Sequence, residues 1–274
     1  MEKDLKTLLF KHGVRLTKAY GQNFLTDTEL LGEIVQKSGI DGNTTVLEIG
    51  PGAGALTREI AKTAKKVIAY EIDTRLKPVL EETVGEFSNV EIVFKDVMKE
   101  KISVLENKLG GEYVMVANLP YYITTPIVMN FLENSTKIKA LVIMVQKEVA
   151  DRFTASAGTS DYGAITVGIN LKGSASTVKF VPREMFTPPP NVDSAVVKID
   201  VDQNKYPEVD TQKVRDVVKK AFMNRRKMLV NNLMNFYKKS RAEAEQILLD
   251  AGVSLTARGE QLTVEDYIRL AQYL

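Results

Sequence analysis

The amino-acid sequence predicts an α/β fold: a doubly wound, mostly parallel seven-stranded sheet with a small C-terminal all-helical domain. Between residues 44 and 155, short apolar segments alternate with amphipathic helical segments, which is typical of a parallel sheet covered on both faces. After residue 155 the pattern becomes β-rich, and after a polar stretch at 201–210 it becomes helical. We therefore expect a large domain at 1–202 and a helical domain at 206–274.

The first helix is expected over 26–39, because Thr26 and Glu29 have capping-box spacing and Gly39 follows the last apolar position. Pro78 should kink or shorten a later helix, and Thr125 and Pro126 should begin another as cap and first residue. The other elements follow from apolar periodicity. Strands are predicted at 44–50, 65–73, 90–96, 113–118 and 139–146, and helices at 55–64, 75–84, 99–109, 124–134 and 147–155.

The second half of the chain is predicted to complete the sheet and then to form helices. Segments 176–182 and 193–201 look like an antiparallel pair added to the sheet edge. Segment 162–171 is β-branched, and its periodicity fits either a strand or a helix. Beyond 210, Val214, Val217 and Val218 form an apolar helical stripe, and further helices are expected at 241–251 and 263–273.

Composition excludes several kinds of chemistry. The 274 residues, 44% of them hydrophobic, suffice for one full core and a second smaller one. The chain has no cysteine, which removes thiolate nucleophiles, disulfides and Cys-ligated zinc, and His12 is its only histidine. No apolar run approaches a membrane span, and the N-terminus does not resemble an export signal. We expect a cytoplasmic protein with neither a metal site nor a membrane partner.

The segment VLEIGPGAG indicates a nucleotide site. Gly50, Gly52 and Gly54 stand between a strand and a helix, where glycine lets a ligand lie against peptide groups near a helix N-terminus. Glu71 ends the next strand, where a carboxylate can accept hydrogen bonds from both ribose hydroxyls, whereas Asp73 is more typical of a helix cap. On this motif alone, a dehydrogenase or a tight turn without a ligand are the alternatives.

Polar residues also end the following strands, with Asp96 after the third and Asn118 after the fourth. The carboxyl edge of an open α/β sheet is where ligands bind, so these side chains are expected to face one site. Glu48, just before the glycines, either orders the loop or is simply a strand-end carboxylate.

The segment NLPYY at 118–122 suits methyl transfer to an exocyclic amine. The side-chain oxygen of Asn118 and the carbonyl of Leu119, held by Pro120, can each accept an N–H of an adenine N6 amine. This directs the nitrogen lone pair at a methyl sulfonium donor. The ring of Tyr121 can stack on the base and stabilise the charge that develops on nitrogen. The alternative is a proline turn with two packed tyrosines.

Six motifs in order carry a family resemblance. They are GQNFL at 21–25, EIGPGAGALT at 48–57, YEID at 70–73, NLPYYITTPI at 118–127, FTPPPNVDSAVV at 186–197 and NRRKML at 224–229. With them the chain resembles the ribosomal RNA adenine N6-dimethyltransferases, which have the class I S-adenosylmethionine methyltransferase fold. Within that family it is most similar to the bacterial enzymes that dimethylate two adjacent adenines near the 3′ end of small-subunit (16S) rRNA.

The resemblance implies S-adenosylmethionine as methyl donor, the small-subunit precursor as partner, and a monomer. It also implies a helix at 162–171. Implied donor contacts are Asn23, Leu25, Gly50, Gly52, Glu71, Asp96 and Asn118. Together with Leu119 and Pro120, Tyr121 and Phe186 would hold the flipped target base, although Phe186 by itself looks like a loop anchor.

The run 213–227 has seven basic residues and one acidic residue, Asp216. Such a run is usually a solvated helix face. An enzyme that takes an adenine out of folded RNA must also hold the surrounding phosphates. We therefore predict phosphate contacts from Lys219, Lys220, Arg226 and Lys227, while Arg225 could instead pack back onto its domain.

Three other functions compete with this one. The same family contains large-subunit rRNA enzymes that confer macrolide resistance, and NLPYYITTPI with an uninterrupted PPP resembles the small-subunit enzymes more. An assembly factor that kept the fold without the chemistry would not need the intact glycine loop, Glu71, Asp96 and NLPY. A dehydrogenase would have no evident use for NLPYY.

Overall fold

The computed structural model describes residues 2–14, 23–119, 123–225 and 227–274. Contacts within the chain divide it into two compact units, Met1–Ala150 with Ser176–Val201, and Asp151–Ala175 with Asp202–Leu274. The chain thus leaves the first unit close to the expected boundary at 202–206. Residues 151–175, however, group with the C-terminal helices, because Tyr162, Val167 and Leu171 are buried in the helical core. The assignment of separate catalytic and RNA-binding domains stays a prediction.

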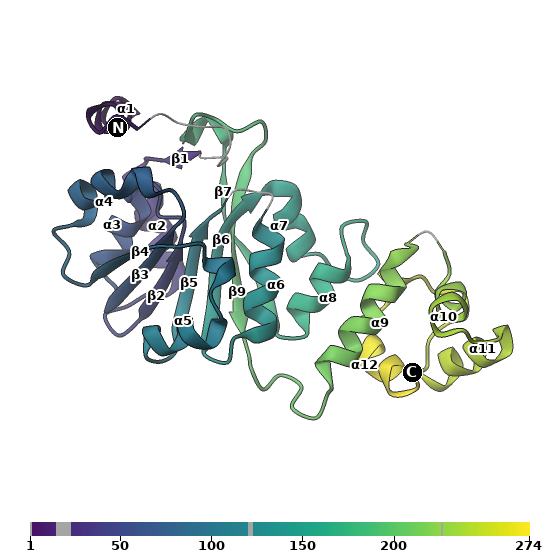
Figure 1. Cartoon of the computed structure of the whole chain (residues 1–274). Helices are drawn as coiled ribbons and strands as arrows, with labels where there is room; N and C mark the ends of the chain where they lie inside the picture. Colours follow the sequence, from purple (N-terminus) through teal and green to yellow (C-terminus); the bar gives the residue numbers. More distant parts are fainter. Residues whose placement is uncertain (1, 15–22, 120–122, 226) are drawn as a thin grey trace. The chain divides into compact units, whose positions relative to one another are not determined.

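The first unit is built on a sheet that is seven-stranded in the described residues, with the order β4-β3-β2-β5-β6-β9-β7 (Figure 1). Strands β4, β3, β2, β5 and β6 pair in parallel, and β9 pairs antiparallel with β6 from Ala140↔Asp200 to Gln146↔Ser194. The predicted mostly parallel sheet is confirmed. The strands are β2 Thr45–Ile49, β3 Lys66–Glu71, β4 Val90–Phe94, β5 Tyr113–Asn118, β6 Ile138–Gln146, β7 Gly173–Val181 and β9 Ser194–Val201.

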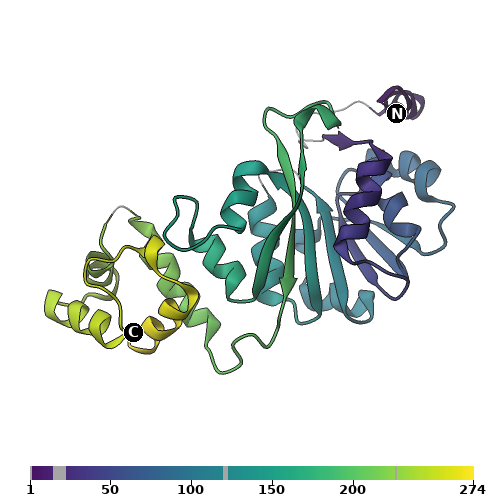
Figure 2. The same ribbon diagram turned by 180° about the vertical axis from the view of Figure 1, so that it is seen from behind.

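Helices cover both faces of this sheet, as the nearly all-apolar strands require. Helix α2 lies over the face seen in Figure 2, and α5, α6 and α7 lie over the face seen in Figure 1. The helices and short 3₁₀ turns that follow the strands on the two faces are α2 Thr28–Ser38, α3 Ala55–Ala61, η2 Thr74–Leu76, α4 Lys77–Val84, η3 Val97–Lys99, α5 Ile102–Leu109, α6 Thr124–Asn134 and α7 Lys147–Phe153. In the described ranges, no helix is both long enough and apolar enough to cross a membrane.

Three predicted helix starts are wrong by one or two residues. The cap of α2 is Asp27, whose carboxylate accepts from the Leu30 amide at 3.0 Å, although Gly39 ends the helix at φ 80° as expected. Helix α4 begins at Lys77, two residues later than predicted, and Pro78 lies in its first turn. The cap of α6 is Ile123, which places Pro126 at the third helical position. Proline is accepted in a first turn because those N–H groups have no helical partner.

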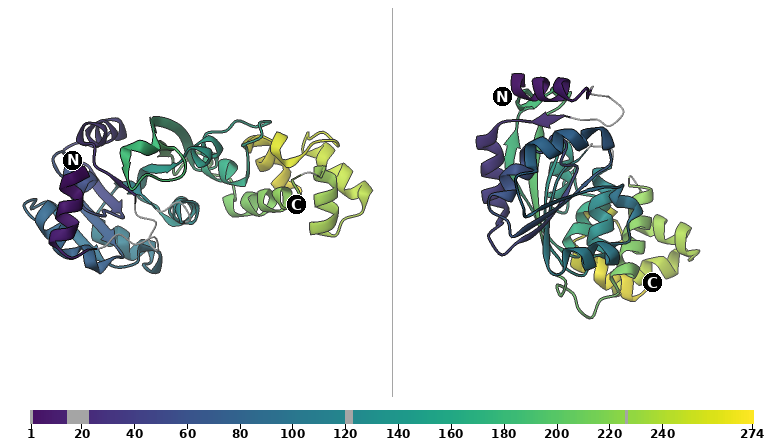
Figure 3. Two further views of the ribbon diagram at one scale, coloured as in Figure 1. Left: turned by 90° about the horizontal axis from the view of Figure 1, so that it is seen from above. Right: turned by 60° about the vertical axis from the view of Figure 1, so that its left-hand side comes forward.

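Helix α1, Glu2–Lys11, was not predicted. Its Leu5 and Leu9 are buried in a cluster with Val79 and Leu80 of α4. Figure 3 (right) shows α1 at the same end of the sheet as the short strand β1, Phe24–Leu25. Strand β1 pairs antiparallel with β8, Phe186–Thr187, which follows the 3₁₀ turn η4, Arg183–Met185. Two motifs far apart in the sequence therefore lie side by side.

The second unit is helical. It contains α8 Ala164–Asn170, α9 Thr211–Met223, α10 Leu229–Tyr237, α11 Arg241–Asp250, η5 Gly259–Gln261 and α12 Val264–Gln272. The ambiguous segment 162–171 is thus a helix, as the resemblance implied. The valine stripe of α9 is buried as predicted, and Asp210 caps this helix through the Lys213 amide at 3.0 Å. Helix α10 was not predicted.

Candidate functional site

A cavity of about 470 Å³ lies where the parallel strands end at their carboxyl edge. The ends of β2, β3 and β5, the turn η3, β1 and α1 all contribute to its wall. Every residue predicted to contact the donor lies on this wall: Asn23, Leu25, Gly50, Gly52, Glu71, Asp96 and Asn118. Leu119 lines it as well.

The glycine loop forms one side of the cavity with its backbone. Gly50 and Gly52 have φ values of 74° and 58°, a left-handed conformation that disfavours residues with a Cβ. A Cβ on Gly52 would also lie 2.9 Å from Cε1 of Phe24. Both positions therefore require glycine, which leaves peptide groups facing the cavity.

Glu71 is held rigidly at the end of β3. Its carboxylate accepts from the Gly52 amide at 3.1 Å and from the Asp73 amide at 2.8 Å, and only 5% of the residue is exposed. Burial raises the pKa of Glu71, and the two backbone donors act against that rise. Asp73 is the predicted cap: it accepts from the Arg75 amide at 3.1 Å and pairs with the Arg75 guanidinium.

Asn118 is the last residue of β5, and the nitrogen of its side-chain amide makes a hydrogen bond. Its Nδ2 donates to the carbonyl of Asn23 at 3.4 Å, which leaves Oδ1 as the acceptor that the NLPYY motif predicts. Asp96 caps η3 through the Met98 amide at 3.0 Å. Pro120 and Tyr121 lie outside the described residues, so their predicted roles stay predictions.

Phe186 does not lie on the cavity wall. It pairs with Leu25 across β1 and β8, is 3% exposed, and belongs to the same core cluster as Leu25. This is the packing expected of a loop anchor. Its contact with the target base stays a prediction.

Glu48 is buried at the cavity wall, with 1% of the residue exposed. Within the described part of the chain, its Oε2 has no hydrogen-bond partner, and neither has the hydroxyl of the fully buried Thr57. Burial raises the pKa of Glu48 to about 8, and the nearby Glu71 carboxylate adds to the rise. The two roles considered from the sequence, loop ordering and a simple strand-end carboxylate, do not by themselves account for a buried, partly unpaired carboxyl.

Sequence reasoning missed the apolar residues of the cavity. Ile72, Val97 and Met98 line it, each just after a strand-end acid, and Leu5 reaches it from α1. Ile72 and Met98 are unusually exposed for their type, at 55% and 42%. Their places, one residue after Glu71 and two residues after Asp96, are the signal that could have identified them. Among the described residues, no cluster of His, Asp or Glu could hold a metal ion.

The predicted phosphate contacts fall in the helical unit. Lys219 and Lys227 are exposed, and no described carboxylate pairs with either side chain. The ammonium of Lys220 lies 4.0 Å from the ring centroid of Tyr237, and Arg226 lies outside the described residues.

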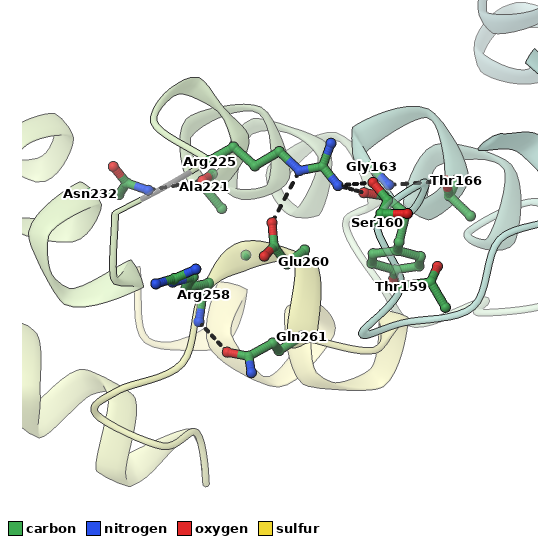
Figure 4. Close-up of polar contacts among 12 residues, drawn as sticks. Thr159, Ser160, Gly163, Thr166, Ala221, Arg225, Asn232, Arg258, Glu260 and Gln261 are labelled. Carbon is green, nitrogen blue, oxygen red and sulfur yellow. Dashed lines mark hydrogen bonds and ion pairs between the residues drawn. The ribbon is translucent and has the colours of Figure 1, made fainter. Parts of the chain in front are cut away.

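Arg225 packs back onto its own unit, the alternative noted from the sequence. Figure 4 shows its guanidinium between Glu260 and the loop before α8. It donates to Glu260 at 3.1 Å, to the carbonyl of Tyr162 at 3.2 Å, and to the carbonyl of Ser160. Close by in the same view, Asn232 donates to the Ala221 carbonyl at 2.9 Å.

The sheet order and the cavity together define the class of this protein: it is an S-adenosylmethionine-dependent methyltransferase with the class I fold. Comparison with known proteins gives the family. The profile described as ribosomal RNA adenine dimethylase matches residues 13–274, and the chain belongs to that family.

Relatives match the chain over its whole length. It is 42% identical to the ribosomal RNA small subunit methyltransferase A of Bacillus licheniformis, covering 100% of this chain and 98% of the relative. The protein of the same name from Geobacillus thermodenitrificans is also 42% identical, with the same coverage.

Two solved structures share the fold. A dimethyladenosine transferase from Plasmodium falciparum superimposes with a TM-score of 0.77 at 25% identity, covering 90% of this chain and 95% of that one. The 23S rRNA methyltransferase ErmE gives a TM-score of 0.71 at 29% identity, covering 92% and 99%. The expected class I fold is therefore confirmed.

The residues of the cavity fit the methyl donor of this family, S-adenosylmethionine. The volume lies within the range of small-molecule sites, roughly 300–1,000 Å³. Glu71 would present a fixed carboxylate to the ribose of the donor, and Gly50 and Gly52 present backbone where a side chain would intrude. When bound, the donor supplies an electrophilic methyl group on a sulfonium.

Proposed function

We propose that this enzyme transfers methyl groups from S-adenosylmethionine to the N6 amines of two adjacent adenines near the 3′ end of small-subunit rRNA, in ribosome biogenesis. The observation that carries the proposal is the orientation of Asn118. Its Nδ2 is engaged by Asn23, so Oδ1 is available to accept an N–H from an amine at the cavity.

The chain's own residues orient the amine and need not remove its proton. With Asn118 Oδ1 and the Leu119 carbonyl each accepting one N–H, the nitrogen lone pair points toward the methyl group. The methylated nitrogen is a cation acidic enough to lose its proton to water. Tyr121 would stack on the flipped base. Phe186 would close the other face, which requires its buried ring to move.

Small-subunit rRNA is preferred as the substrate because of the relatives. Those named for the small subunit are 42% identical over the full chain, whereas the 23S rRNA enzyme ErmE is 29% identical. The similarity to ErmE keeps large-subunit rRNA as the second candidate substrate.

Substrate choice is tested by offering the purified enzyme labelled S-adenosylmethionine with either precursor small subunits or protein-free large-subunit rRNA. We expect label only in the small-subunit RNA, at two adjacent adenines. Primer extension on rRNA from cells lacking the protein should lose the stop that dimethyladenine causes. Label confined to large-subunit RNA would assign the chain to the second candidate.

The remaining features of the proposal concern the partner. The enzyme acts in the cytoplasm as a monomer, and Lys219, Lys220, Arg226 and Lys227 hold phosphates of the particle around the target adenines. The exposure of Lys219 and Lys227 supports this assignment, because no carboxylate among the described residues pairs with either ammonium group. Sedimentation equilibrium of the free enzyme tests the monomer.

A further inference from the structure

Glu48 has no part in the chemistry described above, yet it lies at the donor cavity. It is 1% exposed, and its Oε2 meets no hydrogen-bond donor among the described residues. Leaving a carboxylate unpaired and dehydrated is costly, whereas a neutral carboxylic acid tolerates the same place. Glu71 differs from Glu48, because each of its two carboxylate oxygens accepts a hydrogen bond from a backbone N–H.

The surroundings of Glu48 favour the neutral acid. The charged group that acts on it is Glu71 on the neighbouring strand β3, and like charges oppose each other. From α3 the hydroxyl of Thr57 also acts on it and opposes the rise in the pKa of Glu48, but burial outweighs this contribution. The other ionisable groups on the cavity wall are Tyr70, Asp96 and Lys95, and Lys95 is paired with Glu100 at 2.7 Å.

S-adenosylmethionine changes this balance, because it brings a sulfonium and an ammonium into the cavity against a single carboxylate. A cation close to a buried acid favours its ionised form. We propose that Glu48 is protonated in the free enzyme and gives up its proton to solvent when S-adenosylmethionine binds. The inference depends on S-adenosylmethionine being the donor, as proposed. It means that Glu48, a residue outside the methyl-transfer chemistry, changes its charge when the donor binds.

The linkage is measured by calorimetric titration of the full chain with S-adenosylmethionine at pH 6.5, in two buffers of different ionisation enthalpy. The difference between the two heats counts the protons released. At this pH the donor's own α-ammonium, with a pKa of about 7.7–8.0, stays mostly protonated. We expect the wild type to release roughly 0.5 to 1 proton more per donor than Glu48→Gln, which keeps the shape of the side chain but cannot ionise.

Two control variants identify the source of the proton. Glu71→Gln should bind the donor more weakly and, because it also removes the like charge beside Glu48, should release somewhat less of the proton. Glu112→Gln, an exposed glutamate just before β5 that does not line the cavity, should behave as the wild type. Equal release by wild type and Glu48→Gln, or loss of release in Glu71→Gln alone, would overturn the assignment. If the wild type gave no binding heat, the proposed function would fail too, whereas binding without a buffer-dependent heat contradicts only this inference.

The demethylated product separates the two cations of the donor. S-adenosylhomocysteine has a neutral thioether but keeps the ammonium. Release with the donor and not with the product would assign the linkage to the sulfonium, and equal release with both would assign it to the ammonium. Either result supports ionisation of Glu48, provided that Glu48→Gln removes it.

Discussion

At the scale of single residues, the site depends on polar side chains whose partners fix their direction. Asn118 is oriented by the carbonyl of Asn23, just before β1, and Glu71 by the backbone amides of Gly52 and Asp73. Neither side chain must reorganise when a ligand arrives, which is the arrangement expected for efficient electrostatic catalysis. The two residues differ in what they orient, so their removal should have different consequences.

Asn118→Ala should abolish methyl transfer, because it removes one of the two acceptors that orient the attacking amine. Removing one oriented polar group of this kind costs about 10²- to 10³-fold in turnover. Single-turnover assays with saturating S-adenosylmethionine check this, with Asn130→Ala on α6 as the matched surface control. Near-native turnover in Asn118→Ala would contradict the assigned role.

Glu71→Ala should weaken S-adenosylmethionine binding while leaving RNA affinity nearly unchanged. Hydrogen bonds to a charged group contribute about 1.5–3 kcal/mol, so donor affinity should fall roughly 10- to 100-fold. Calorimetry with each ligand measures both effects, and Glu91→Ala, an exposed glutamate on β4, is the control. An equal reduction for both ligands would point to unfolding of the variant.

At the scale of elements, the basic run of α9 and the following turn contains residues of two kinds. The guanidinium of Arg225 donates to Glu260 and to carbonyls of the loop before α8. Lys219 and Lys227 are instead exposed to solvent, and Lys220 lies over the ring of Tyr237. Charge count alone does not separate these groups, whereas the contacts assign Arg225 to packing within the helical unit.

Replacing Lys219, Lys220, Arg226 and Lys227 with Ala should weaken association with the small-subunit particle and leave donor binding intact. The slope of log affinity against log salt should flatten by roughly 0.7 to 0.9 for each phosphate that is no longer neutralised by a side chain. A matched variant removes Lys65, Lys101, Lys108 and Lys139, four lysines remote from the run in sequence, with the same change of charge. If both variants showed the same slope, the run would be a solvated face.

Arg225→Ala serves as a second comparison within the run. Its guanidinium already donates inside the helical unit, so the salt slope should stay close to that of the wild type. The substitution should instead lower the free energy of unfolding by about 1 kcal/mol, since the side chain is partly exposed.

At the scale of the whole molecule, Glu48 links the stability of the fold to pH. Its pKa is about 8 in the folded protein and 4.5 as the ordinary value, because burial disfavours the charge. The unfolded chain therefore releases this proton at lower pH than the folded one does. The contribution of Glu48 to the free energy of unfolding is therefore most favourable below about pH 4.5. It decreases as the pH rises from 4.5 to 8 and changes no further above that range.

Glu48→Gln should consequently be more stable than the wild type at pH 7, by on the order of 2 to 3 kcal/mol, with the difference shrinking toward pH 5. Urea denaturation without donor, followed by circular dichroism across this pH range, measures it. A stability difference that did not change with pH would show that Glu48 does not titrate in the folded protein.

The α/β order and the polar residues that gather at the cavity could be predicted from the sequence alone. These features are local: apolar periodicity marks each strand, and the residue that ends a parallel strand reaches the carboxyl edge wherever the strand lies. Asn118, Glu71 and Asp96 could therefore be predicted from position alone, and the family motifs supplied the donor and the target base.

The contacts between distant segments could be learned only from the three-dimensional structure. The pairing of β1 with β8 sets Leu25 beside Phe186, and α1 brings Leu5 to the cavity wall. The burial of Glu48 and the inward turn of Arg225 likewise depend on neighbours contributed by other elements. Burial and long-range contacts are properties of the packed chain, because the free energy of an ionised or hydrogen-bonded group depends on what surrounds it and not on its sequence neighbours.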